Sequence, residues 1–159
     1  MKKRKTGINR VKAIIALLAV FVLVIVLFQF NHKSAIIRFV ENHSDELMHY
    51  AEDMIQTGSN GESEIYGDYE VTYWADTGMV EFVARKTGIG SSSVYEGFYY
   101  SLNDMPLGFQ GNQVDFTVSD SGWIWKESNG DNWEYTEKIQ EHWYIFDKIQ
   151  GRRKLKNGW

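Results

Sequence analysis

An unbroken apolar run near the start constrains this chain more than any other feature. Every residue from 13 to 28 is apolar (AIIALLAVFVLVIVLF), and Gln29 and Phe30 extend the stretch to 18 residues. A helix of this length spans roughly 27 Å, close to the hydrocarbon thickness of a bilayer, about 30 Å. Backbone polar groups in lipid must bond to one another, which a helix achieves. The run therefore predicts a transmembrane helix over residues 13–30.

The charges on either side of the run predict its orientation. Residues 1–12 contain six basic side chains and no acidic one, whereas only Lys33 and Arg38 follow closely after the run. Because basic flanks stay in the cytoplasm, we expect 1–12 to be a basic cytoplasmic segment and residues 34–150 to form an extracytoplasmic domain. The alternative is a cleaved signal peptide, but its apolar core is usually about 7–15 residues and a small-x-small site follows it. The expected localisation is the cell membrane, as an uncleaved single-pass signal anchor with the lipid bilayer as partner.

Charge and composition exclude several classes of function. The net charge of −4 hides a domain, residues 34–150, with 6 basic and 21 acidic side chains, followed by a basic tail at 151–159. Nucleic acid is an unfavourable partner for so acidic a domain, because phosphates are bound by lysine and arginine. The chain has no cysteine, which excludes disulfides, cysteine-ligated zinc, iron–sulfur clusters and thiol catalysis.

Hydrophobic periodicity predicts the elements that follow the apolar run. Residues 34–57 repeat apolar side chains at three- and four-residue steps and predict an amphipathic helix, with a left-handed cap at Gly58. Residues 58–64 are polar and predict a linker. Turn signals then separate five short strands, expected at 69–75, 80–84, 94–102, 114–118 and 123–126.

A second helix is expected from Trp133 to Gln150. Asp131 is a suitable N-cap, and an apolar stripe follows at Ile139, Trp143, Phe146 and Ile149. The predicted fold class is therefore α+β: an N-terminal transmembrane helix, an amphipathic helix, an antiparallel five-strand meander and a C-terminal helix.

No motif predicts a catalytic residue, a metal site or a cofactor. The serines at 91–93 lack the GxSxG context of a nucleophile. His43 with Glu46, and His49 with Asp53, have the spacing of helical pairs, but no third metal ligand is placed near them.

The surplus of aromatic residues is the strongest hint of a binding surface. Tyr99 and Tyr100 should point to opposite faces of their strand, whereas Trp123 and Trp125 should share one face. Exposed aromatic rings bind sugars, peptides or proteins, so we expect these four residues to contribute to binding. The alternative is that they form a second, partly covered layer of packing.

Two segments resemble stretches that recur in a group of small proteins of Gram-positive bacteria. They are VYEGFYYSLNDMPLGFQG at 94–111 and GDNWEYTEKIQEHWYIFDKI at 130–149. The resemblance covers about the last 60 residues. It implies a bacterial cell-envelope setting, and it implies no activity and no catalytic residue.

Three functions remain open on the sequence alone. The first is a membrane-anchored extracytoplasmic binding or accessory domain of the bacterial cell envelope, whose partner is an envelope protein or a glycan. The second is an immunity or regulatory protein that binds a toxin or a membrane enzyme. The third is a small envelope hydrolase using acids such as Glu96 or Asp115. A hydrolase requires a pocket with at least two convergent polar groups of shifted pKa.

Overall fold

The computed structural model describes residues 14–21, 32–89 and 92–151, in two compact units, 1–35 and 36–159. In the first unit, residues 14–21 are helical. No helix in the described part of the chain is long and apolar enough to cross a membrane. This finding contradicts the predicted transmembrane helix, the signal anchor and the membrane localisation, which were inferred from hydropathy alone. Residue 13 and residues 22–30 lie outside the described residues, as do 1–12 and 152–159.

The helix of the second unit is continuous apart from one turn. Residues 36–42 of this unit are helical, His43 is a turn residue, and α2 (Ser44–Thr57) follows. The backbone bonds from His43 N to Phe39 O (3.1 Å) and from Leu47 N to His43 O (2.9 Å) carry the helical pattern across the turn. Gly58 ends α2 with an extended backbone, φ −72°, rather than the expected left-handed cap. A side chain there would lie 2.5 Å from Met54 O, so close approach to the helix requires glycine.

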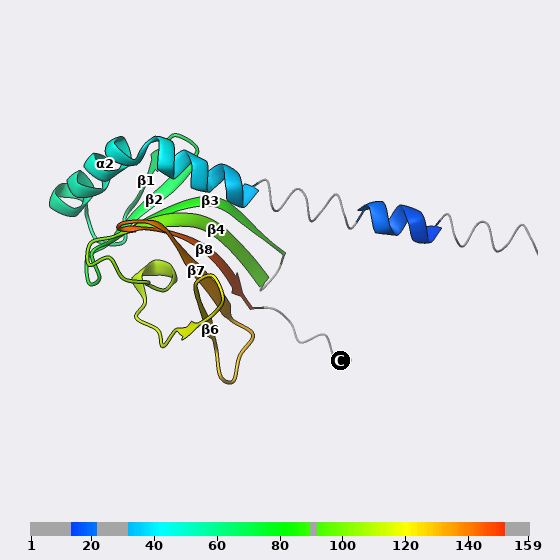
Figure 1. Cartoon of the computed structure of the whole chain (residues 1–159). Coiled ribbons are helices and arrows are strands. Elements are labelled where there is room, and N and C mark those ends of the chain that lie inside the picture. Colours follow the sequence, from blue (N-terminus) through cyan, green and yellow to red (C-terminus); the bar gives the residue numbers. More distant parts are fainter. Residues whose placement is uncertain (1–13, 22–31, 90–91, 152–159) are drawn as a thin grey trace, which may run out of the picture. The chain divides into compact units, whose positions relative to one another are not determined.

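An antiparallel sheet of eight strands forms the rest of the fold (Figure 1). Its spatial order is β1-β2-β3-β4-β8-β7-β6-β5, so the last hairpin inserts beside β4. The strands are β1 (Ser63–Tyr66), β2 (Tyr69–Trp74), β3 (Met79–Ile89), β4 (Ser92–Ser101), β5 (Thr117–Val118), β6 (Trp123–Lys126), β7 (Trp133–Gln140) and β8 (Trp143–Gln150). A short 3₁₀ helix, η1 (Phe109–Gly111), lies in the connection from β4 to β5.

The predicted five-strand meander with a C-terminal helix is wrong. The five expected strands overlap β2 to β6, but β1 begins at the end of the expected linker, and the expected helix at 133–150 is the β7–β8 hairpin. The apolar stripe of this segment has helical spacing, but in the strand its members Trp143 and Phe146 lie on opposite faces. Its aromatic and β-branched residues favour a strand, and the middle of β8 is buried on both faces, as only a central strand can be.

Each face of the sheet has its own hydrophobic core. On the helix side, Leu47, Ala51 and Met54 of α2 pack against alternate residues of the central strands, among them Phe82, Phe98 and Trp143. On the opposite side, Met79, Tyr99, Tyr144 and Phe146 pack against Leu107 and Phe109 of the β4–β5 connection. Figure 1 shows α2 on one side of the sheet and the yellow-green β4–β5 connection on the other.

Candidate functional site

Two glutamates on the face opposite the helix are buried, although charged side chains are rarely buried in proteins. Glu81 on β3 is 2% exposed and Glu134 on β7 is 1% exposed. Both carboxylates accept hydrogen bonds from backbone N–H groups of the β4–β5 connection. Glu134 Oε1 accepts from Phe109 N at 2.5 Å, and Glu81 Oε1 accepts from Gln110 N at 3.0 Å. The two acids therefore hold the tip of this connection against the sheet.

The sheet register places Glu81 opposite Thr72 of β2 and two pairs away from Trp74, on the same face of the sheet. The indole Nε1 of Trp74 donates to Glu81 Oε2 at 3.2 Å. Gly111 makes this arrangement possible: its φ is +66°, and a Cβ there would lie 2.7 Å from the Cβ of Trp74. A glycine at this bend lets the connection lie directly on the indole.

The two buried acids differ in how their charge is compensated. Burial raises the pKa of Glu81 to about 7, although the N–H groups of Gln110 and Trp74 oppose the rise. Glu134 and Glu70 add to the rise through charge repulsion. Burial also raises the pKa of Glu134, but the ammonium of Lys148, 3.2 Å from its Oε2, pulls that pKa down. Glu81 therefore changes charge near neutral pH.

A cavity of about 180 Å³, here named the Glu81 pocket, opens beside this carboxylate. It lies over β2, β3 and β4 and is closed on one side by the β4–β5 connection. Its lining combines two carboxylates, one ammonium, three aromatic rings and smaller groups: Glu70, Glu81, Lys86, Trp74, Tyr95, Phe109, Gly61, Ser63, Thr72, Val83 and Gln110. Pockets for drug-sized ligands are about 300–1,000 Å³, so this one fits a smaller group.

The four residues that the sequence suggested for binding lie elsewhere. Tyr99 and Tyr100 are 0% and 4% exposed and, as predicted, belong to opposite faces. The Tyr99 hydroxyl accepts a hydrogen bond from Leu107 N at 2.9 Å, so it also fixes the β4–β5 connection. Trp123 and Trp125 are half-buried near Glu134, on the face of the sheet opposite the helix. None of the four lines the Glu81 pocket.

The acids considered for a hydrolase also lie apart. Glu96 forms an ion pair with Arg85 on the helix side of the sheet. Asp115 is exposed in the segment before β5. Neither lines the Glu81 pocket.

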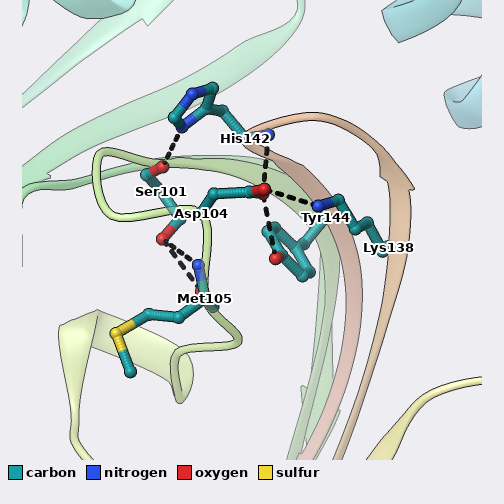
Figure 2. A network of polar contacts seen from close by, with 6 residues as sticks. All are labelled: Ser101, Asp104, Met105, Lys138, His142 and Tyr144. Carbon is teal, nitrogen blue, oxygen red and sulfur yellow. Dashed lines mark hydrogen bonds and ion pairs between the residues drawn. The ribbon is translucent and has the colours of Figure 1, made fainter.

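A second polar network fixes the other end of the β4–β5 connection (Figure 2). The Asp104 carboxylate accepts hydrogen bonds from Lys138 Nζ at 2.6 Å, His142 N at 2.8 Å and Tyr144 OH at 3.1 Å. The Lys138 contact is the main cause that lowers the pKa of Asp104. His142, with φ +64°, turns β7 into β8, and its Nδ1 bonds to Ser101 O at 2.8 Å. The Ser101 hydroxyl bonds to Met105 rather than to the imidazole, so the cluster holds a turn and is not a catalytic triad.

Sequence reasoning missed the Glu81 pocket for a physical reason. Alternation along β3 places Val80 and Phe82 in the core beneath the helix and thus Glu81 on the other face. The sequence left open whether this face is exposed or partly covered, and an acid on an exposed face is ordinary. The β4–β5 connection covers this face, and the sequence around Glu81 gives no sign of that contact.

No protein family, curated protein or solved structure matches this chain. The resemblance to small proteins of Gram-positive bacteria stays a prediction, and the function must be argued from the site.

Proposed function

We propose that the chain is a binding domain whose site is the Glu81 pocket and whose ligand is a small polar molecule. The observation that supports this most is the cavity itself, in which a buried carboxyl of pKa about 7 faces the same space as three aromatic rings. Binding sites typically combine apolar walls with a few polar groups that fix orientation, and strongly shifted pKa values gather at such sites.

Binding accounts for the site better than hydrolysis does. A hydrolase needs a second polar group of shifted pKa directed at the same space. The other buried acid, Glu134, directs its oxygens at Phe109 N and Lys148 Nζ and does not line the cavity. The pocket then has one buried acid held by fixed donors, which suits recognition of a polar group rather than proton exchange between two acids.

A panel of small probes followed by NMR tests the proposal. Glucose, N-acetylglucosamine, acetate, glycine and methylammonium are added separately, and the Gln110 amide and Trp74 indole N–H signals are monitored, since both groups donate to Glu81. At least one probe should shift these signals saturably. Ser63→Trp, at an exposed position on the pocket rim, should abolish the shift by filling the cavity. The proposal fails if no probe shifts the signals, or if Ser63→Trp leaves the response intact.

A further inference from the structure

The face that carries the Glu81 pocket already holds one ammonium group of the protein itself. Lys148 is 9% exposed, and its Nζ lies 3.2 Å from Glu134 Oε2. The same Nζ lies 4.7 Å from the ring centre of Trp125 and 6.0 Å from that of Phe109. The carboxylate provides the opposite charge, and the ring faces attract the cation through their quadrupoles. This fold therefore stabilises a buried ammonium with one buried carboxylate and two aromatic rings.

The surroundings of Glu81 repeat this arrangement without a cation paired to the carboxylate. Its carboxylate is as deeply buried as that of Glu134, and Trp74, Tyr95 and Phe109 are among the residues that line the pocket. Phe109 takes part in both arrangements, since it lies near Lys148 and also lines the cavity. Within residues 32–89 and 92–151, no basic side chain forms an ion pair with Glu81.

Three other charged groups lie around Glu81, one each on β2, β3 and β7. Glu70 on β2 lines the rim of the pocket, and Glu134 on β7 acts on Glu81 through repulsion. Lys86 on β3 is exposed at the rim, where its Nζ lies over the Tyr95 ring, 5.3 Å from the centre. The field at Glu81 is thus dominated by acids, which favours a positively charged ligand.

Glu81 also retains hydrogen-bonding capacity. Each of its oxygens accepts one hydrogen bond, from Gln110 N or from Trp74 Nε1, whereas a carboxylate oxygen has two acceptor positions. A metal ion is a poorer match than an ammonium, because no group of three metal-binding side chains occurs in the described part of the chain.

We propose that the Glu81 pocket binds the ammonium group of a small organic cation, with the Glu81 carboxylate as counter-ion and the three aromatic rings as walls. This inference rests on the proposed function and names its ligand class. The volume of about 180 Å³ suits an alkylammonium head group rather than a large ligand. Binding would supply Glu81 with the charge partner that Lys148 gives to Glu134.

A titration of the full chain with matched charged and uncharged probes tests the inference. Tetramethylammonium and methylammonium chloride are compared with tert-butanol, an uncharged molecule of similar shape, at constant chloride. The affinity is obtained from the Gln110 amide and Trp74 indole signals. The cations should bind at least about tenfold more tightly than the alcohol, and Glu81→Gln should remove at least about tenfold of that affinity. Glu141→Gln, at an exposed position, is the control and should leave the affinity unchanged.

The pH dependence of cation binding to the wild-type protein tests the inference even if Glu81→Gln does not fold. With a pKa of about 7, the ionised fraction of Glu81 rises from about a tenth to about nine tenths between pH 6 and pH 8. Affinity for the cations should therefore rise about tenfold over this interval. Equal binding of tert-butanol and the cations overturns the ammonium inference and leaves the proposed function standing. Absence of cation binding, or binding independent of pH, also overturns the inference, while the sugars and acids of the wider panel decide the proposed function separately.

Discussion

Replacing Glu81 by glutamine should change how the stability of the protein depends on pH. A carboxyl whose pKa is higher in the folded state binds more protons there than in the unfolded state. The free energy of unfolding therefore falls as the pH rises from the unfolded pKa, 4.5, to the folded pKa, about 7. The difference of about 2.5 units corresponds to about 3 kcal/mol at 1.36 kcal/mol per unit. Wild type should lose this amount between about pH 4 and about pH 8, and Glu81→Gln should not.

Urea unfolding followed by tryptophan fluorescence measures this effect at a series of pH values. Glutamine offers one acceptor oxygen to two N–H donors, so the variant also carries a pH-independent loss of about 1–3 kcal/mol. The test therefore depends only on how the difference in unfolding free energy between the two proteins changes with pH. Relative to wild type, Glu81→Gln should gain about 3 kcal/mol as the pH rises. A difference that stays flat would show that the folded protein does not raise the pKa of Glu81. Glu141→Gln controls for the substitution itself.

Three further predictions concern the scaffold of the site. Gly97→Ala should lower the unfolding free energy by about 3 kcal/mol or more, measured by urea unfolding, since its Cβ would lie 2.1 Å from Phe82 O in the middle of the sheet; an effect below about 1 kcal/mol would contradict this packing. Tyr99→Phe should cost about 1–3 kcal/mol in the same assay and speed hydrogen exchange in the β4–β5 connection, because a backbone N–H loses its buried acceptor; unchanged exchange there would count against the role of the hydroxyl. Asp104→Asn should cost about 1 kcal/mol at neutral pH, where the ion pair with Lys138 is partly screened by solvent. Because the pKa of Asp104 is lowered in the folded state, this cost should disappear as the pH falls below 3.8, and a cost that persists in acid would argue against it.

Strands with alternating apolar side chains and turn residues at their ends could be located from the sequence. Strand β6, Trp123–Lys126, has the expected bounds, and β2 differs from expectation by one residue. The opposite faces of Tyr99 and Tyr100 followed from strand geometry alone.

The β7–β8 hairpin could not be predicted locally. Its turn has no glycine or asparagine, and His142 adopts φ +64°, a conformation that side chains disfavour. The turn depends on Asp104, 38 residues earlier, whose carboxylate accepts a hydrogen bond from His142 N (Figure 2). Without knowledge of that contact, the apolar stripe at helical spacing favoured a helix.

The Glu81 pocket was beyond sequence reasoning for the same reason. Its chemistry arises because residues 106–111 fold over an acid on β3 and isolate it from water. Burial, rather than residue type, turns an ordinary surface glutamate into a group that titrates near neutral pH.

The most direct test is to measure the titration of the Glu81 side-chain carboxyl by carbon-13 NMR, with and without tetramethylammonium. In the free protein its pKa should be about 7. The bound cation should lower that pKa, because an opposite charge stabilises the ionised form. A carboxyl that titrates near 4.5 in the free protein, or whose titration the cation leaves unchanged, would contradict the assignment of this pocket as an ammonium site.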